Sequence, residues 1–293
     1  IQSGAGDGAS MADVIYEAEG ATILSEAKEV YGQADIILKV AAPVCDGGSE
    51  VNEVLMMKPD AILIGMLNPL FAHDQVKAYA KHGLTSFAME LIPRISRAQS
   101  MDALSSQSNL AGYKAVIDAA NAFGQVLPMM MTAAGTLVPA KVVVMGAGVA
   151  GLQAIATARR LGAIVSAFDV RPAVKEQVES LGASFIDVEN KMADSAETAS
   201  GYAEEMDADY QDRQATIIGE TLENQDICIT TAQIPGKKAP VLITEEMVRN
   251  MKNGSVIVDL ATETGGNCEL SESDAVVKKH GVTIIGYSNY PAR

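Results

Sequence analysis

Several residue types are scarce in this sequence, and each shortage excludes a class of protein. The 293 residues include no Trp, three Cys and three His. Cys45, Cys228 and Cys268 are far apart and make no C-x-x-C pair. The sequence therefore predicts neither a zinc site nor a disulfide framework, and it favours a reducing compartment. Apolar runs are short as well, and none approaches the roughly 18 residues of a membrane-spanning helix.

Basic residues are outnumbered, with 22 Lys and Arg against 37 Asp and Glu and a formal net charge of -15. This balance excludes a nucleic-acid-binding surface, which requires clustered Lys and Arg against the phosphates. With 48% hydrophobic and 20% charged residues the chain is globular, and its length allows one large or two ordinary domains. No basic region followed by an apolar one begins at Ile1, so we expect no secretory signal there. We expect both ends to continue in a longer chain.

Short apolar runs alternate with helix-like stretches, which predicts βαβ units and parallel sheets. In the first half the predicted strands cover residues 36–40, 61–65 and 85–89, with a helix over 49–58. In the second half they cover 141–145, 163–168, 227–230, 255–259 and 282–287, with a helix over 151–161. A long helix over 101–123 connects the halves. We therefore predict an N-terminal α/β domain over residues 1–124 and a second domain over residues 125–293.

The strongest motif is a G-x-G-x-x-G run, Gly146-Ala147-Gly148-Val149-Ala150-Gly151, between a β-branched strand and a helix. Gly146 permits a tight turn, Gly148 lets a pyrophosphate approach the backbone, and Gly151 lets helix and strand pack closely. Val149 and Ala150 begin the helix, whose free N–H groups would face the phosphates. The alternative is a tight turn that binds no ligand. The context favours a Rossmann-type, doubly wound dinucleotide-binding domain.

Asp169 ends the strand that follows this helix, and its carboxylate is placed to accept the ribose hydroxyls of the adenosine half. Val170 and Arg171 come next in the sequence. A 2′-phosphate about 4 Å from the carboxylate would cost about 4 kcal/mol at an effective dielectric of about 20. Arg171 would soften that cost. The sequence therefore favours NAD over NADP.

Two loops follow later strands of the same half and are candidate ligand contacts, because loops at the carboxyl ends of parallel strands contact the ligand in this fold. The first contains Thr231, Ala232 and Gln233, and the second contains Gly266. The alternative for each is a simple turn, Pro-Gly in the first and Gly-Gly in the second.

A polar segment, residues 93–106, precedes the long helix. Arg94 and Asp102 are expected to pair, and Gln99 and Ser105 add hydrogen-bonding groups. The alternative is a helix-capping loop, in which Ser100 or Ser105 caps the helix. A second polar segment, residues 187–213, holds nine acidic and two basic residues together with Tyr202. It is either a solvated surface excursion or a mobile flap that closes over a nucleotide.

An evident proton acceptor is missing from these segments. Oxidising an alcohol or amine removes a proton as well as a hydride, so such enzymes place a general base near the nicotinamide. His73, His82 and His280 fall outside every candidate cofactor segment and are expected on helices or at helix ends. The sequence also has no G-x-S-x-G motif and no metal-ligand cluster.

The sequence resembles the NAD(H)-binding component, domain I, of proton-translocating nicotinamide nucleotide transhydrogenases over essentially its whole length. Five runs carry the resemblance: Pro-Arg-Ile-Ser-Arg-Ala-Gln-Ser at 93–100, Ser-Ser-Gln-Ser-Asn-Leu-Ala-Gly-Tyr at 105–113, Gly-Ala-Gly-Val-Ala-Gly-Leu-Gln-Ala at 146–154, Ile-Pro-Gly-Lys at 234–237 and Gly-Gly-Asn-Cys at 265–268. The first of these runs is highly specific.

The resemblance implies two Rossmann-like doubly wound domains with parallel sheets, joined by a long helix, with the cofactor in the cleft. It implies that Arg94, Gln99, Asp102 and Ser105 hold the nicotinamide end of NAD(H), and that the segment around Tyr202 closes on the nucleotide. It also implies a homodimer at the cytoplasmic or mitochondrial-matrix face of a membrane. That dimer would dock on the NADP(H)-binding component of a complex that also has a membrane-spanning component, and hydride transfer would be coupled to proton translocation.

Two alternatives remain. The first is a soluble enzyme resembling alanine dehydrogenase, a relative of this family. Its catalytic histidine falls near Met66 and its aspartate near Glu263, so this sequence lacks the histidine. The second is a regulatory subunit that binds a dinucleotide without chemistry. The missing base favours the transhydrogenase, because hydride transfer between two nicotinamides moves no proton at the reacting carbons.

Overall fold

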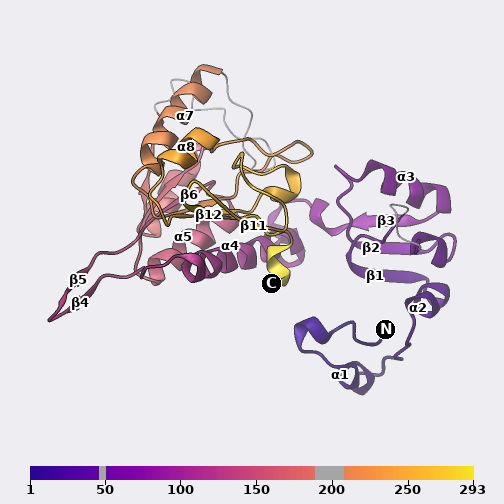
Figure 1. The fold of residues 1–293 in the computed structure, drawn as a ribbon. Helices are drawn as coiled ribbons and strands as arrows, with labels where there is room; N and C mark the ends of the chain where they lie inside the picture. The colour runs from indigo at the N-terminus through magenta and orange to yellow at the C-terminus, as the bar shows by residue number, and fades with distance from the viewer. Residues whose placement is uncertain (46–50, 189–207) are drawn as a thin grey trace. The chain divides into compact units, whose positions relative to one another are not determined.

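The computed structural model describes residues 1–45, 51–188 and 208–293, and it forms two compact units, Ile1–Leu104 and Ser105–Arg293 (Figure 1). The sequence places the domain boundary at residue 124, after the long helix. The structure assigns almost all of that helix, α4 (Ala103–Ala122), to the second unit. The reason is packing, because Ala115, Val116 and Ala119 of α4 lie in the core of the second unit.

The first unit contains a three-stranded parallel sheet in the order β1-β2-β3, as the sequence predicts. Its strands are β1 (Ile36–Ala41), β2 (Ile62–Met66) and β3 (Thr85–Ala88), and its helices are α1 (Asp13–Ala18), α2 (Ala27–Gln33) and α3 (His73–His82). The core of this unit is small. Leu63 of β2 is fully buried, and Tyr79 of α3 and Leu67 pack in the same cluster.

The helix predicted over residues 49–58 is wrong in the described part, where only a 3₁₀ turn over Val54–Met56 forms. Glu53 ties this segment to β1 instead. Its carboxylate accepts hydrogen bonds from Val44 N–H at 2.7 Å, from the Tyr31 hydroxyl at 2.8 Å and from Lys39 Nζ at 3.0 Å. Burial raises the pKa of Glu53, but these bonds outweigh it and hold the pKa below its ordinary value.

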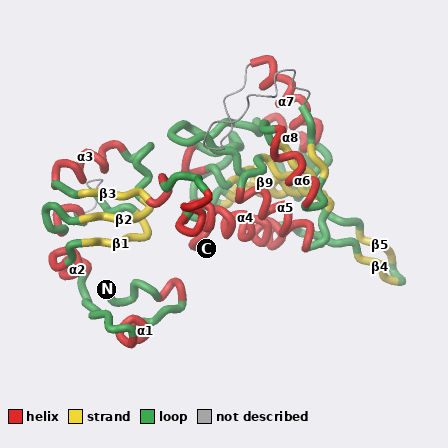
Figure 2. Tube along the Cα trace, turned by 180° about the vertical axis from the view of Figure 1, so that it is seen from behind, coloured by secondary structure: helices red, strands yellow, loops and turns green. Residues whose placement is uncertain are grey.

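The second unit contains a seven-stranded sheet in the order β11-β12-β10-β9-β6-β7-β8 (Figure 2). The strands are β6 (Lys141–Met145), β7 (Ile164–Phe168), β8 (Ser184–Phe185), β9 (Ile227–Thr230), β10 (Val256–Asp259), β11 (Val276–Lys279) and β12 (Val282–Ile285). All pairs are parallel except β11 with β12. Counting the six parallel strands from β6 along the chain gives the order 3-2-1-4-5-6, which is the doubly wound dinucleotide fold that the sequence predicts.

Helices cover both faces of this sheet, and alternate residues of β6 show how (Figures 1 and 2). Val142 and Val144 pack on one face in a core cluster that contains residues of α4, α5 (Val149–Arg160) and α6 (Lys175–Ser180). Val143 and Met145 pack on the other face in a cluster that contains residues of α7 (Ala208–Leu222) and α8 (Glu245–Asn250). Burial on both faces explains the unbroken apolar run of this strand. No helix within the described ranges is long and apolar enough to cross a lipid bilayer.

A two-stranded hairpin, β4 (Met130–Thr132) and β5 (Gly135–Leu137), extends away from the rest of the second unit in both views (Figures 1 and 2). Nothing in the sequence pattern predicts it. Every residue of its two strands is exposed, and Met131 is 75% exposed. The arm therefore presents apolar side chains to solvent.

Candidate nucleotide-binding site

The turn that follows β6 requires glycine at its first position. Gly146 has a φ of 97°, a left-handed conformation that residues with a side chain rarely adopt. A Cβ added there would lie 2.5 Å from Thr231 Oγ1. The Gly146 N–H donates to the carbonyl of Phe168 at 2.8 Å, which joins the turn to β7. The chain thus reverses sharply where β6 ends.

The other two glycines of the motif have opposite surroundings. A Cβ added at Gly151 would overlap the carbonyl oxygen of Gly146, so α5 packs directly against the turn. A Cβ added at Gly148 would meet no atom within 4 Å. The backbone is therefore open at Gly148, where a pyrophosphate would approach, and closed at Gly151, where helix and strand meet. This pattern fits a bound dinucleotide.

The first turn of α5 is prepared for an anion. Gly148 is the N-cap residue and offers no side chain to the first N–H groups of the helix, which begins with Val149 and Ala150. These N–H groups have no partner within the helix and carry the positive end of its dipole. The N-terminus therefore suits a phosphate group.

Asp169 lies at the end of β7 beside this turn, and its side chain is only 5% exposed. Its Oδ2 accepts from the Ala147 N–H at 2.7 Å and from Arg171 Nη2 at 2.9 Å. Its Oδ1 accepts from the backbone N–H and from Nε of Arg171, both at 2.9 Å. Four donors therefore engage the carboxylate that the sequence assigns to the ribose. A ribose hydroxyl would have to replace one of them, and the guanidinium offsets the negative charge.

Other residues flank Asp169. Val170 is half-buried against the core of the second face. Tyr210 of α7 is buried, and burial together with the charge of Asp169 raises its pKa to about 12. The phenol therefore stays protonated at neutral pH. Tyr202, assigned to a closing segment, lies outside the described residues.

The loop after β9 lies against the turn after β6. The Thr231 hydroxyl donates to the Gly146 carbonyl at 3.0 Å, and the Thr231 N–H donates to Met145 O at 2.8 Å. Gln233 is exposed, and its Nε2 donates to the Leu260 carbonyl at 3.2 Å. Gly146, Thr231 and Asp169 therefore meet at the carboxyl edge of the sheet, at the reversal of strand order.

Asn267, which sequence reasoning does not assign to the site, holds this loop in place. Its Oδ1 accepts from the Ala232 N–H at 3.0 Å, and its Nδ2 donates to Ala232 O at 2.9 Å and to Pro240 O at 2.8 Å. The residue is fully buried, and every polar atom of its amide has a partner. The position of the Ala232 peptide is therefore fixed from both sides.

Asp259, at the end of β10, fixes Asn267 in turn. The carboxylate is fully buried and receives five hydrogen bonds, from Thr230 Oγ1, Ala261 N, Asn267 N, Cys268 N and Ser271 Oγ, at 2.7–3.1 Å. Gly266 has a φ of 85°, and a Cβ there would lie 3.0 Å from Asp259 Oδ2. Asp259 therefore organises both loops from beneath. An acidic residue at the end of a fully buried strand was the available signal in the sequence.

The four residues assigned to the nicotinamide lie between β3 and the first turn of α4. Arg94 and Gln99 are exposed, and Gln99 belongs to a 3₁₀ helix over Ser96–Met101. The Asp102 N–H donates to Gln99 O at 3.3 Å, and Asp102 precedes α4. Ser105 is half-buried in the first turn of α4. Their role at the nicotinamide, and the pairing of Arg94 with Asp102, stay predictions.

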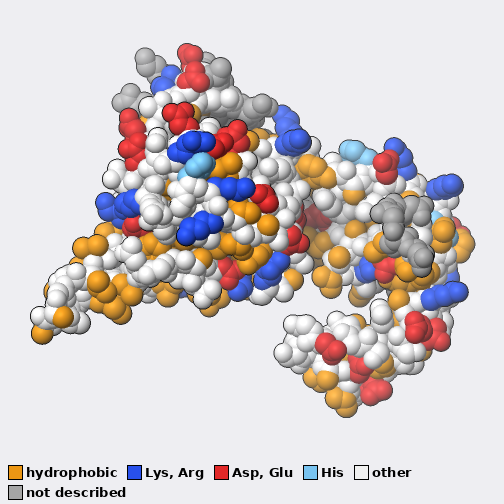
Figure 3. All heavy atoms as spheres, viewed as in Figure 1, with side chains coloured by type: hydrophobic (Ala, Val, Ile, Leu, Met, Phe, Trp, Pro, Cys, Tyr) orange, Lys and Arg blue, Asp and Glu red, His pale blue; other side chains and the backbone are white. Residues whose placement is uncertain are grey.

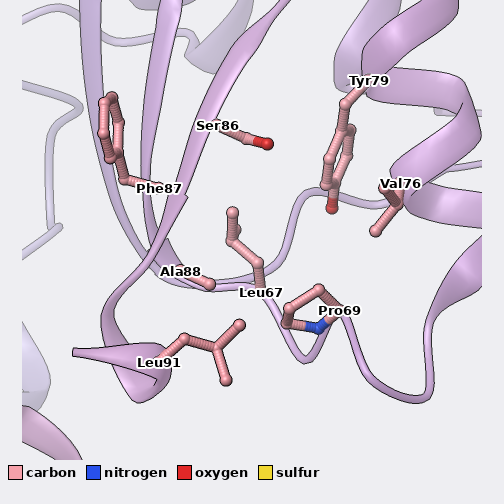
Figure 4. A pocket seen from close by; sticks show the side chains of 8 residues that line it. All are labelled: Leu67, Pro69, Val76, Tyr79, Ser86, Phe87, Ala88 and Leu91. Carbon is pink, nitrogen blue, oxygen red and sulfur yellow. The ribbon is translucent and has the colours of Figure 1, made fainter. Parts of the chain in front are cut away.

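A pocket in the first unit lies where β2 and β3 end (Figure 4). It is lined by Leu67, Pro69, Val76, Tyr79, Ser86, Phe87, Ala88 and Leu91. Burial raises the pKa of Tyr79 to about 12, so its phenol is no base at neutral pH. This pocket therefore offers no side chain that would take up a proton.

The three histidines are placed elsewhere. His73 begins α3 and is exposed, and His82 at the end of α3 lies with its Nε2 2.8 Å from Met57 O. His280 lies in the turn between β11 and β12 rather than at a helix end, and it pairs with Glu245 at 2.9 Å. In the described ranges no three His, Cys, Asp or Glu residues are grouped as metal ligands.

Comparison with known proteins covers the whole chain. Residues 1–111 match the family "Alanine dehydrogenase/PNT, N-terminal domain", and residues 115–293 match "Alanine dehydrogenase/PNT, C-terminal domain". A protein of Rhodospirillum rubrum, the first portion of a divided alpha subunit of NAD(P) transhydrogenase, is 57% identical over 293 residues. The match covers 100% of this chain and 76% of that protein.

Solved structures agree. A transhydrogenase from Sinorhizobium meliloti superposes with a TM-score of 0.87 and 52% identity, covering 100% of this chain and 77% of the other. An L-alanine dehydrogenase superposes with a TM-score of 0.79 and 26% identity, covering 100% of this chain and 74% of the other. The likeness in sequence is thus much greater to the former.

Proposed function

The chain belongs to the alanine dehydrogenase/PNT family, and we propose that it is the NAD(H)-binding component of a proton-translocating NAD(P) transhydrogenase. The observation that carries the proposal is the 57% identity to a transhydrogenase alpha subunit along the whole chain. The open backbone at Gly148, beside the closed packing at Gly151, supports a dinucleotide there.

In this proposal the second unit holds the adenosine and pyrophosphate. The turn from Gly146 to Gly151 receives the phosphates, Asp169 with Val170 and Arg171 borders the ribose, and the loops around Thr231–Gln233 and Gly266 border the nicotinamide half. Tyr202 belongs to a segment that closes over the nucleotide. The fixed position of Ala232 supports this division of labour, because a preorganised loop loses little entropy on binding.

Bound NADH supplies a hydride to the nicotinamide of NADP⁺ held by a partner, with the Re/Si stereospecificity of this enzyme class. Arg94, Gln99, Asp102 and Ser105 orient the reacting ring and take up no proton, because the reacting carbons release none. The placement of His73, His82 and His280 outside the nucleotide-binding turn supports chemistry without a histidine base.

The partners in this proposal are an NADP(H)-binding component and a membrane-spanning component of the same complex. Proton passage through the membrane component drives the hydride step or is driven by it. The chain would lie at the cytoplasmic or mitochondrial-matrix face of the membrane. The name of the Rhodospirillum rubrum relative, which makes it a portion of one subunit, supports partners of this kind.

Reconstitution tests the function. We expect the protein, mixed with an NADP(H)-binding component, to transfer hydride from NADH to an NADP⁺ analogue, and to oxidise no alanine alone. Alanine turnover would instead favour an alanine dehydrogenase, the second candidate, which rests on the shared family. NADH binding without transfer beside the partner would favour a regulatory subunit.

Nucleotide preference is the first prediction. We expect NADPH to bind about 10- to 100-fold more weakly than NADH, because Asp169 repels the 2′-phosphate while Arg171 offsets part of its charge. Asp169→Asn should shrink the ratio and Arg171→Ala should enlarge it. Lys175→Ala is the matched control, since it breaks an exposed ion pair with Asp187. Calorimetric titrations measure the ratio, and equal wild-type affinities would contradict the role of Asp169.

The exposed hairpin supports the proposal of a homodimer. Residues 125–140, which contain β4 and β5, include no charged residue, although the whole chain has a net charge of -15 (Figure 3). Met131 is 75% exposed and Val138 is 76% exposed. An apolar arm without charge is suited to burial against a second copy, because it brings no like charges together.

We therefore expect a solution mass of twice 30.7 kDa for the wild type and a monomer for Val138→Glu, since burying the new carboxylate would cost several kcal/mol. Val241→Glu is the control, because Val241 is 58% exposed elsewhere on the second unit. Light scattering after size-exclusion chromatography measures the mass. A dimer that withstands Val138→Glu would place the interface elsewhere.

A further inference from the structure

Helix α4 touches the nucleotide-binding turn at one residue, Gly112. A Cβ added there would overlap the carbonyl oxygen of Ala150 and lie 2.8 Å from its carbonyl carbon and 3.0 Å from its Cα. The neighbouring atoms are backbone, so they have no flexible side chain to move away. The two helices therefore meet backbone to backbone in the first turn of α5 (Figures 1 and 2).

Glycine is otherwise a poor choice at this position. Gly112 lies in the middle of the 20-residue helix α4, where glycine is less favourable than alanine. It is buried, and the small residues Ala111 and Ala115 pack beside it in the core of the second unit. The helix therefore loses intrinsic stability at Gly112, and the close approach to Ala150 is what it gains.

We propose that Gly112 is a positioning residue that sets the location of the phosphate-binding turn. Ala150 carries one of the first N–H groups of α5, and a rigid backbone contact behind it holds that group in place. This inference rests on the proposed function, because it presumes that a dinucleotide pyrophosphate binds at this turn. It also gives a role to the Ser-Asn-Leu-Ala-Gly-Tyr run of α4, which the cofactor contacts do not explain.

The test compares three variants. Gly112→Ala adds a Cβ at the contact. Gly124→Ala is the matched control, because a Cβ at Gly124, just beyond α4, meets no atom within 4 Å. Leu152→Ala, in the same turn of α5, loosens the packing against the core that α4 shares, without adding an atom. It serves as the second route if Gly112→Ala does not fold.

Two measurements are made on each variant. The first is affinity for NADH, ADP and adenosine, by titration or by displacement of NADH fluorescence. We expect Gly112→Ala to weaken NADH and ADP at least about 10-fold, because hydrogen bonds to a charged phosphate are lost, and to leave adenosine unchanged. Leu152→Ala should weaken NADH and ADP about 3-fold, a smaller effect of the same sign.

The second measurement is hydrogen exchange of the free protein. The Leu152 N–H donates to Gly148 O at 2.8 Å and reports on the first turn. It should exchange faster in Gly112→Ala and at the wild-type rate in Gly124→Ala. Equal NADH affinity for wild type, Gly112→Ala and Leu152→Ala would overturn the role of Gly112. So would an equal loss for NADH, ADP and adenosine. A wild-type protein that binds neither NADH nor ADP would instead overturn the proposed function, and this inference with it.

Discussion

Asp259→Asn is expected to lower the free energy of unfolding of the second unit by about 3 kcal/mol. The buried carboxylate accepts five hydrogen bonds, and an amide in its place has one oxygen to accept them. Its NH₂ group would face either Ala261 N–H or the N–H groups of Asn267 and Cys268, so donor would oppose donor. For a unit of this size the loss corresponds to about 10 °C in melting temperature.

Ser271→Ala is the matched control for that experiment. It removes one of the five donors, at 2.7 Å from Asp259 Oδ2, and leaves no donor opposed. We expect it to cost about 1 kcal/mol. Circular dichroism melts of the three proteins measure the difference. A melting temperature for Asp259→Asn within about 2 °C of that of Ser271→Ala would show that Asp259 is not the organising group beneath the two loops.

The second sheet could be predicted from the sequence because burial on both faces leaves an unmistakable pattern. β6 and β9 are apolar or β-branched along nearly their whole length, and Gly146 follows β6 at once. Such runs bounded by turn residues have few other folded states. The strand order then follows from the dinucleotide motif, since the motif fixes which strand is central.

Other features escaped prediction because distant contacts decide them. The spacing of Val51, Val54 and Leu55 suits a helix, yet Glu53 is pulled toward Lys39 and Tyr31 and the helix does not form. The hairpin β4–β5 has no inward face, so it carries no alternation of apolar and polar residues. Local pattern is silent on both features.

The candidate site divides in the same way. The roles of Gly146 and Gly151 follow from backbone sterics that hold wherever the motif forms. The engagement of Asp169 by Arg171 depends on side-chain conformation, and the support of Ala232 by Asn267 joins residues 35 positions apart. Sequence spacing therefore locates the turn, whereas only the fold reveals what holds the surrounding loops.

Asp102→Asn and Arg94→Ala are expected to lower hydride transfer in the reconstituted complex about 100-fold. In the proposed function these residues orient the reacting ring, and misplacement by about 1 Å has an effect of that size on rate. NADH affinity should change little, because Gly146, Gly148 and Asp169 would still hold the rest of the nucleotide. Single-turnover transfer and NADH titration are measured on the same samples.

The control variants separate this role from a helix cap. Asp118→Asn removes a carboxylate from the same helix, where it pairs with Lys114 at 2.7 Å, and Arg97→Ala removes an exposed guanidinium near Arg94. We expect both to transfer hydride at nearly the wild-type rate. A capping role for Asp102 predicts instead a loss of about 1 kcal/mol in stability and an unchanged rate for each folded molecule. If transfer per folded molecule survives Asp102→Asn and Arg94→Ala, the segment is structural, and the ring must be oriented by other residues.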